Sequence, residues 1–383
     1  MRRAVRSTPA AFYQRVREIL ESARAGVART VNTTHVMANW LIGREIVEEE
    51  QRGKAKAGYG ERLLEELSGR LKADFGRGYS VDNLELFRRF YQDYRQLISD
   101  AASRKSIDAD ISDALRRKSF MPHARGESWT PGQLHPNLSW THYRTLLRVD
   151  KADARAFYEI EAIENHWSAR ELERQINSLL YERLALSKDK KGLMKLATKG
   201  HVVQHPTDVF KDPVVMEFLG LPESPRLVES RLEEALINNL QTFLLELGKG
   251  FAFVARQKRL TLDGDHFYID LVFYHTVLKC YVLIDLKTGK LTHQDLGQLQ
   301  LYVNYYDRER RTTGDGPTLG LILCADKNEA VVKYTLGPEQ EKKIFASRYK
   351  LHLPTEAELK TELRREVRQL TGPSTKRSGK KVS

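Results

Sequence analysis

Cysteine is nearly absent from this chain of 383 residues, which carries only Cys280 and Cys324. Two cysteines are too few for a disulfide framework or for a zinc site built on cysteine ligands. Long apolar runs are also missing, since none approaches the roughly 18 residues that a membrane-spanning helix requires. The basic first residues include no apolar segment like that of a secretory signal. We therefore expect a protein of the reducing cytoplasm with no membrane partner.

Acidic residues are outnumbered by basic ones. The chain has 63 lysines and arginines against 51 aspartates and glutamates, which gives a formal net charge of +12. Basic chains of this size commonly bind a polyanion, because contacts with phosphates release counterions. The charge therefore favours nucleic acid as a partner, with a protein that is merely basic as the alternative. A hydrophobic content of 41% is enough for packed cores and excludes a disordered chain.

Helical periodicity dominates residues 10–187, which we predict to form a helical N-terminal domain. Within it, an amphipathic helix over 61–75 ends at a glycine-containing turn, and Ser80 can cap a second helix over 81–94. This order resembles a helix-turn-helix, a motif found in DNA-binding proteins. Five basic residues on or before the second helix are candidates for binding nucleic acid: Arg70, Lys72, Arg77, Arg88 and Arg89. A plain helical hairpin with a solvated basic face is the alternative interpretation.

Three stretches lack the pattern of a regular element. A long loop is predicted near 96–137, a proline-containing linker at 188–226 and a basic tail at 371–383. Between the linker and the tail, residues 227–360 have the apolar runs of a mixed α/β domain. Its expected elements are, in order, a helix, three strands, a helix and a strand, over 227–248, 251–262, 266–275, 279–287, 295–310 and 318–325. The predicted fold class is an α-helical N-terminal region followed by an α/β C-terminal domain.

Two of these strands carry charges where a buried strand is expected to be apolar. Asp270 lies in FYIDLVFYH, and Asp285 and Lys287 lie in YVLIDLKTG. Both segments are apolar at odd and even positions, which indicates that both faces are covered. Burying an ionised carboxylate costs several kcal/mol unless it is paired or bound to a metal. These three residues are therefore candidates for a functional site, and a self-satisfied ion pair among them is the alternative.

The turn between the two strands decides whether the carboxylates meet. In an antiparallel pair, a turn of even length places Asp270 on the same face as Asp285, whereas an odd length places them on opposite faces. Two carboxylates on one face can hold a hard cation such as Mg²⁺ through oxygen ligands. Lys287 shares the face of Asp285, and it can activate a water molecule or stabilise charge on a phosphate.

Asp270 and the Asp-Leu-Lys triplet that begins at Asp285 resemble the PD-(D/E)xK nuclease motif. The wider chain resembles the YhcG-type bacterial family, in which a helical N-terminal domain precedes a PDDEXK nuclease domain. The resemblance covers most of residues 10–355, with matching stretches at 59–91, 167–184, 232–260, 267–275, 282–291, 297–307 and 319–324. It implies a mixed-sheet, restriction-endonuclease-like fold for the C-terminal domain.

The resemblance also implies roles for individual residues. Asp270 stands at the first aspartate of the motif and Asp285 at its second acid, both as catalytic residues and metal ligands, and Lys287 stands at the catalytic lysine. Glu233 on the preceding helix matches the glutamate that often completes the metal site in this superfamily, and an ordinary solvated glutamate is the alternative. Ile269 replaces the proline of the motif, and its second acid is an aspartate instead of a glutamate. Neither departure excludes metal binding.

Gln298 and Tyr302 lie four residues apart on the following helix and resemble the family's Gln-xxx-Tyr element. The resemblance implies an auxiliary role for them, in which they contact DNA or support the lysine. A packed aromatic residue is the alternative for Tyr302.

The resemblance as a whole implies a nuclease that uses Mg²⁺, or Mn²⁺, to hydrolyse DNA phosphodiester bonds. RNA stays open as a substrate, because phosphate contacts do not distinguish the two sugars. A homodimer that cuts two strands is compatible with the sequence. The alternative function is a catalytically silent protein that binds nucleic acid or assembles a complex on a nuclease-like scaffold.

Overall fold

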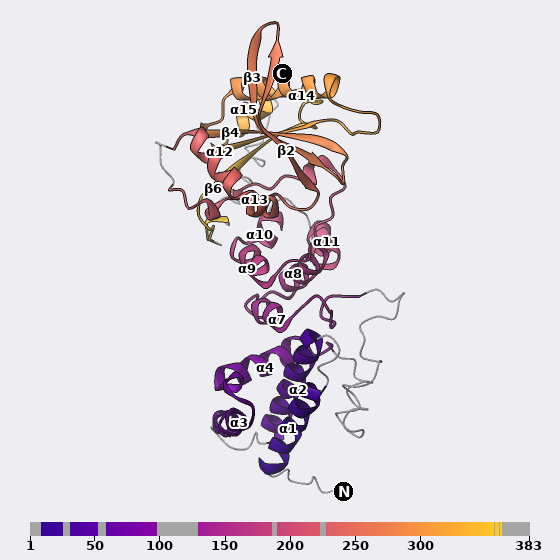
Figure 1. Ribbon diagram of the computed structural model, residues 1–383, viewed down its shortest axis with the longest axis vertical. Coiled ribbons are helices and arrows are strands. Elements are labelled where there is room, and N and C mark those ends of the chain that lie inside the picture. Colours follow the sequence, from indigo (N-terminus) through magenta and orange to yellow (C-terminus); the bar gives the residue numbers. More distant parts are fainter. Residues whose placement is uncertain are drawn as a thin grey trace, which may run out of the picture. The chain divides into compact units, whose positions relative to one another are not determined.

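The computed structural model describes most of the chain (Figure 1). The described residues are 9–25, 31–52, 59–97, 129–185, 190–222, 227–355, 357–359 and 361. The chain divides into two compact units, Met1–Ile176 with Leu193–Gly200 and Asn177–Gly192 with His201–Ser383. The predicted basic tail and most of the predicted long loop lie outside the described residues.

The N-terminal unit is helical, as predicted. Its helices are α1 (Pro9–Ala25), α2 (Val31–Arg52), α3 (Tyr59–Phe75), α4 (Val81–Asp93), α7 (Trp140–Leu146), α8 (Ala152–Glu164) and α9 (Ala169–Asn177). The 3-10 turn η1 (Arg77–Tyr79) separates α3 from α4, and Ser80 caps α4 by accepting a hydrogen bond from the Asn83 N–H at 3.3 Å. Gly43 lets α2 approach α4 closely, because a Cβ there would lie 2.0 Å from the Phe87 carbonyl oxygen.

A six-stranded mixed sheet forms the centre of the C-terminal unit, in the order β1-β6-β5-β4-β3-β2. The strands are β1 (Val214–Val215), β2 (Phe251–Leu262), β3 (Asp265–His275), β4 (Cys280–Lys290), β5 (Leu319–Asp326) and β6 (Ile344–Lys350). Neighbours among β2, β3 and β4 pair antiparallel, whereas β4, β5, β6 and β1 pair in parallel. Helix α14 (His293–Glu309) makes the crossover from β4 to the parallel strand β5. The unit therefore has the mixed α/β fold that the sequence predicts.

The remaining elements include three differences from the prediction, the first of which is that residues 188–226, predicted to be a linker, contain a helix, a strand and two 3-10 turns. The remaining elements are the helices α10 (Leu180–Ala185), α11 (Lys190–Lys199), α12 (Glu229–Asn238), α13 (Leu240–Leu247) and α15 (Glu329–Thr335), and the 3-10 turns η3 (Pro206–Asp208) and η4 (Glu217–Leu219). The single helix expected over 227–248 is broken at Asn239, whose φ of −118° and ψ of 29° leave the helical range. Strands β1 and β6 are not predicted by the pattern, because a two-residue strand has no periodicity and β6 mixes polar residues among apolar ones.

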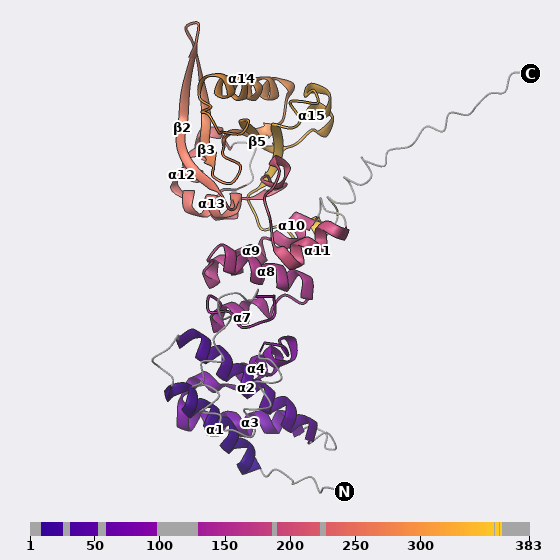
Figure 2. The same ribbon diagram turned by 90° about the vertical axis from the view of Figure 1, so that its right-hand side faces the viewer.

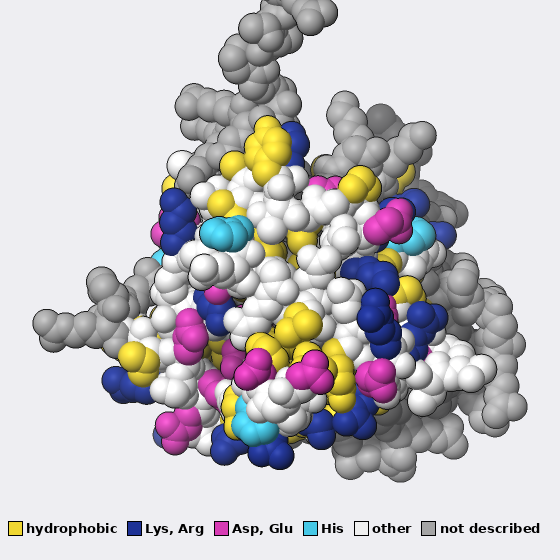
Figure 3. Space-filling view, turned by 90° about the horizontal axis from the view of Figure 1, so that it is seen from above, with side chains coloured by type: hydrophobic (Ala, Val, Ile, Leu, Met, Phe, Trp, Pro, Cys, Tyr) yellow, Lys and Arg dark blue, Asp and Glu magenta, His cyan; other side chains and the backbone are white. Residues whose placement is uncertain are grey.

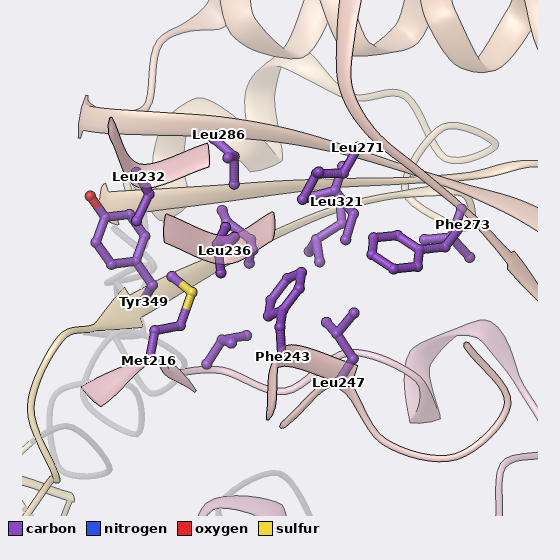
Figure 4. Close-up of a cluster of buried hydrophobic side chains, with 14 of the residues drawn as sticks. Met216, Leu232, Leu236, Phe243, Leu247, Leu271, Phe273, Leu286, Leu321 and Tyr349 are labelled. Atoms are coloured by element: carbon purple, nitrogen blue, oxygen red, sulfur yellow. The ribbon is translucent and has the colours of Figure 1, made fainter. Parts of the chain in front are cut away.

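Helices cover both faces of the sheet, and each face has its own apolar core (Figure 2). On one face, α12 and α13 contribute Leu232, Leu236 and Phe243 (Figure 4). On the opposite face, α14 contributes Leu299 and Tyr302. Because both faces are buried, a charged residue within β3 or β4 is exceptional and requires a partner.

The surface seen in Figure 3 carries both signs of charge, with Lys and Arg side chains in several groups and Asp and Glu side chains between them. Positive charge does not form one continuous patch on this face. The partners of individual cations therefore decide where a polyanion can bind. Over the ranges that the structure describes, no helix is long and apolar enough to cross a lipid bilayer.

Candidate active site

The candidate site lies at a fork where β3 separates from β4. β3 pairs with β4 from Leu271 to His275, whereas its pairing with β2 continues out to Asp265. The turn between β3 and β4 spans residues 276–279, an even length. Leu271 pairs with Ile284, so the same register continued by one residue sets Asp270 opposite Asp285. Of the two cases that the sequence leaves open, the structure therefore has the one in which the two aspartates share a face.

Asp270 is held at the mouth of the fork by hydrogen bonds from both neighbouring strands. The Leu286 N–H of β4 donates to its Oδ2 at 2.8 Å, and the Gln257 side-chain amide of β2 donates to its Oδ1 at 3.1 Å. Burial raises the pKa of Asp270, although the hydrogen bond from Leu286 and the charge of Lys287 act to lower it. The Asp270 carboxylate thus accepts the hydrogen bond from the Leu286 N–H that a backbone carbonyl of a neighbouring strand would otherwise accept. This hydrogen bond fixes the position of the carboxylate.

Asp285 is the most deeply buried acid of the site, with 2% of its surface exposed. The Lys287 Nζ lies 3.0 Å from its Oδ2, so the two side chains form a close ion pair. Burial raises the pKa of Asp285 to about 7; Lys287 opposes this shift and the nearby Asp270 adds to it. A carboxylate oxygen has more than one lone pair, so the Asp285 Oδ2 can bind a further cation beside Lys287.

Lys287 is surrounded by acids. Besides Asp285, its Nζ lies 3.8 Å from the Glu229 Oε2 on α12. Burial acts to lower the pKa of Lys287, but the carboxylates of Asp285, Glu229 and Asp270 together raise it. The ion pair between Asp285 and Lys287, which is the alternative interpretation of the sequence, is therefore present. A single lysine nevertheless cannot neutralise the carboxylates of Asp285, Glu229 and Asp270 together.

Glu233 on α12 reaches the same site through Gln257. The Gln257 amide donates to the Glu233 Oε2 at 2.6 Å and also contacts Asp270, so it bridges the two carboxyl groups. Burial raises the pKa of Glu233, the hydrogen bond from Gln257 lowers it, and Asp270 raises it further. Glu233 is 9% exposed, so the structure does not support a solvated helix glutamate.

Gln257 is the site residue that the sequence does not indicate. It has a φ of +44°, a left-handed conformation that non-glycine residues rarely adopt. Such strained positions are found more often at functional sites than elsewhere. Its immediate neighbours in β2, Arg256 and Lys258, are also polar, so no break in the sequence pattern identifies it.

The donor types suit a hard cation, but the side chains do not form a closed ligand shell. In the part of the chain that the structure describes, no three Asp, Glu, His or Cys side chains converge closely enough for a preformed metal site. The Gln257 amide lies between Glu233 and Asp270, and Lys287 neutralises Asp285. The oxygen donors and the buried Asp285 Oδ2 nevertheless fit Mg²⁺, because a cation would favour the ionised form of carboxyl groups whose pKa is raised mainly by burial.

Gln298 and Tyr302 support β3 from the α14 side. Tyr302 is completely buried, and its hydroxyl donates to the Tyr268 carbonyl oxygen at 3.1 Å. The Gln298 amide donates in turn to the Tyr302 hydroxyl at 2.5 Å. Burial raises the pKa of Tyr302, and Asp285 and Asp270 add to this effect. Tyr302 is thus both a packed aromatic residue and a brace for β3, and its hydroxyl contacts Tyr268 and not Lys287.

The five basic candidates of the N-terminal unit divide into two groups. Arg70 pairs with Glu66 at 2.7 Å, Arg88 with Glu50 at 2.9 Å and Arg89 with Asp150 at 2.9 Å. Lys72 and Arg77 are exposed, and no ion pair to either is found among the described residues. Three of the five cations are therefore already neutralised by acids of the same chain.

Comparison with known proteins identifies the family. Residues 207–364 match the YhcG PDDEXK nuclease domain, and residues 15–183 match the DUF1016 N-terminal domain. The chain belongs to the YhcG PDDEXK nuclease family. It is 37% identical over 371 residues to the protein named "Putative nuclease YhcG" from Escherichia coli (strain K12), and the match covers 92% of this chain and 94% of that protein. YhcG-family membership and the six-stranded mixed sheet give the C-terminal unit a restriction-endonuclease-like fold.

Two solved structures are similar to part of this YhcG-family chain. A repair endonuclease from Pyrococcus abyssi matches with a TM-score of 0.24 and 16% identity, over 35% of this chain and 50% of that one. The structure of an EndoMS–dsDNA2 complex matches with a TM-score of 0.25 and 15% identity, over 36% of this chain and 47% of that one. The chain therefore spans about half the length of each of these structures.

Proposed function

We propose that this chain is a metal-dependent nuclease that hydrolyses DNA phosphodiester bonds at the fork between β3 and β4. The observation that carries the proposal is the alignment of Asp270 with Asp285 beside Lys287, in a chain of the YhcG PDDEXK family. Asp270 and Asp285 are the proposed ligands of Mg²⁺, with Mn²⁺ as a substitute, because oxygen donors suit hard cations. When bound, such an ion supplies positive charge against the scissile phosphate and lowers the pKa of water.

Lys287 is proposed to act as a cation and not as a base. Although burial opposes its charge, the surrounding carboxylates raise the pKa of Lys287, so it stays protonated at neutral pH. A protonated amine cannot abstract a proton from water, but it can donate hydrogen bonds to a phosphate oxygen and stabilise the negative charge that develops there. Of the two roles that the sequence offers, charge stabilisation therefore fits the surroundings of Lys287.

Glu233 is the proposed third acid of the metal site. Its Oε2 accepts from the same Gln257 amide that contacts Asp270, so both carboxyl groups become available once that amide turns away. An amide donor stabilises the two charges before a metal arrives. We therefore expect the site to exchange the Gln257 contacts for a cation.

Cleavage assays with site variants test this function. The purified chain is incubated with supercoiled, linear and branched DNA in Mg²⁺, Mn²⁺, Ca²⁺ or EDTA, beside Asp270→Ala. We expect cleavage that requires Mg²⁺ or Mn²⁺ and that is lost in the variant. Glu234→Ala, on the same helix as Glu233, is a matched control that removes an exposed carboxylate and is expected to cleave normally. Equal cleavage by Asp270→Ala and the wild type would contradict the assignment.

A catalytically silent nucleic-acid-binding scaffold is the second candidate function. The observation that favours it is that the carboxylates of the site already have partners within the chain. Gln257 donates to Glu233 and Asp270, and Lys287 pairs with Asp285. A scaffold of this kind would bind DNA in a salt-sensitive manner with no turnover in any metal. The same assay separates the two functions, because only the nuclease converts supercoiled DNA to product.

A further inference from the structure

The outer part of the β2–β3 hairpin extends past the fork as an arm, defined here as residues 257–270 (Figure 2). Its two strands pair with each other out to Leu262 and Asp265, and β4 does not pair with the arm. A two-residue turn, Asp263-Gly264, closes it, with φ values of +48° and +93°. Two positive φ values are typical of the turn that matches the natural twist of a hairpin. The arm is thus a regular element attached directly to the candidate site.

The two faces of the arm differ. Leu260 and Ile269 are buried in the apolar core beneath α14. The alternate residues Arg259 and Tyr268 pair across the two strands, and alternation directs them to the other face. Tyr268 is 47% exposed, and its backbone is fixed by the hydrogen bond from Tyr302. An exposed aromatic ring therefore stands on a braced strand two residues from Asp270, a distance of about 7 Å along the strand.

Two cations of the arm have no acidic partner among the described residues, unlike three of the five candidate cations of the N-terminal unit. Lys258 and Arg259 are exposed, and neither side chain has an ion-pair or hydrogen-bond partner among the residues that the structure describes. A cation without an acidic partner can release counterions when it meets a phosphate, whereas a paired one must first give up its partner. Charge on an edge strand also discourages strand-to-strand association, which is the competing explanation for these two residues.

We propose that this arm binds the DNA strand next to the cleaved bond, with Arg259 on a backbone phosphate and Tyr268 stacked against an unpaired base. This inference rests on the proposed nuclease function and adds a substrate class to it. Bases within a duplex are already stacked on their neighbours, so an exposed tyrosine face can be used only by a base that is unpaired. The preferred substrate is therefore DNA with single-stranded nucleotides beside the cut, such as an overhang or a branch.

Binding measurements without cleavage test the arm. Fluorescein-labelled DNA is used as a single strand, as its blunt duplex and as that duplex with a single-stranded overhang, and anisotropy is recorded in EDTA and in Ca²⁺. We expect Tyr268→Leu to weaken binding of the overhang and the single strand by about tenfold, which corresponds to about 1.4 kcal/mol, with no change for the blunt duplex. Tyr268→Trp is expected to restore binding. Tyr334→Leu, which removes an 83% exposed tyrosine on α15, is the matched control and should bind like the wild type.

Arg259→Ala is expected to weaken binding of all three DNAs and to reduce the slope of log affinity against log salt, by about 0.9 for the blunt duplex and about 0.7 for the single strand. Arg310→Ala, which removes an exposed arginine just past the far end of α14, is its control. Wild-type affinities in both arm variants would overturn the proposal, and self-association of these variants in sedimentation would identify edge protection as the role of the cations.

Cleavage by Asp270→Ala and DNA binding by the arm variants together distinguish a failure of the arm proposal from a failure of the nuclease assignment. If Asp270→Ala still cleaves DNA, the catalytic assignment falls while the binding differences of Tyr268→Leu stand. If Asp270→Ala is inactive while Tyr268→Leu and Arg259→Ala both bind every DNA like the wild type, the arm proposal alone is wrong.

Discussion

Replacing Asp285 by asparagine tests the electrostatics of the metal-free site. Burial, increased by Asp270 and opposed by Lys287, raises the pKa of Asp285 from 3.8 to about 7 in the folded chain. The folded state therefore binds this proton more tightly than the unfolded state does. The resulting stability is fully present below pH 3.8 and is lost as the pH rises through about 7. A shift of this size corresponds to roughly 4 kcal/mol.

Asparagine keeps the shape of the side chain and removes the charge. At pH 8 in EDTA, Asp285→Asn should recover part of the lost stability. The pKa of about 7 already includes the attraction of Lys287. The gain is smaller than the full shift because the asparagine NH2 group is an additional buried donor that needs a hydrogen-bond partner. We expect a net increase of about 2 kcal/mol in the free energy of unfolding at pH 8. Because the folded wild type gains stability as the pH falls below about 7, this advantage of the variant should shrink between pH 8 and pH 5.

Urea denaturation of the full chain between pH 5 and pH 8 measures this effect. Glu246→Gln is the matched control, because Glu246 is equally buried but forms an ion pair with Arg183 at 2.6 Å. Breaking that pair should cost about 3 kcal/mol at pH 8. In addition, Mg²⁺ should stabilise the wild type more at pH 8 than at pH 6, and it should not stabilise Asp285→Asn. A loss of stability at pH 8 in Asp285→Asn, similar to that of Glu246→Gln, would refute the reasoning.

Three further predictions concern single contacts. Lys287→Met should lower the cleavage rate by roughly 100- to 1,000-fold without weakening DNA binding in Ca²⁺, since it removes a charge that acts on the phosphate during the reaction; a change confined to affinity would contradict this. Gln257→Ala should increase Mn²⁺ affinity in calorimetry, because the amide that bridges two carboxylates is gone; unchanged affinity would mean that the amide does not compete with metal. Gly43→Ala should lower the free energy of unfolding by about 2 kcal/mol, because the new Cβ would overlap the Phe87 carbonyl, whereas Gly69→Ala, with no atom within 4 Å, should be neutral or stabilising.

The elements of the C-terminal unit could largely be predicted because their signals are local. The β-branched and aromatic runs that predict three strands correspond to β2, β3 and β4, and the segment over 295–310 corresponds to α14. Strand β1 and the break at Asn239 gave no such signal. A two-residue strand exists only through its pairing with β6, and the helix break depends on how α12 and α13 each pack beneath the sheet.

The candidate site shows the same division. Asp270, Asp285 and Lys287 could be identified because a charge inside an apolar strand conflicts with its surroundings. Gln257 could not, because a glutamine among exposed polar residues conflicts with nothing in the sequence. Its importance comes from the left-handed backbone and the bridge to Glu233, which are properties of the folded chain.

The sequence by itself determined most of the helices and strands, the resemblance to the family, and the charged residues that a buried strand must compensate, because periodicity, composition and motifs are local properties. Only the tertiary structure decided that Asp270 faces Asp285, that Arg88 is neutralised by Glu50, and that Lys258 and Arg259 of the hairpin arm have no acidic partner among the described residues. Whether a charge is available for binding depends on neighbours far away in the chain. Those neighbours are set by strand register and helix packing, which are fixed only when the apolar cores close.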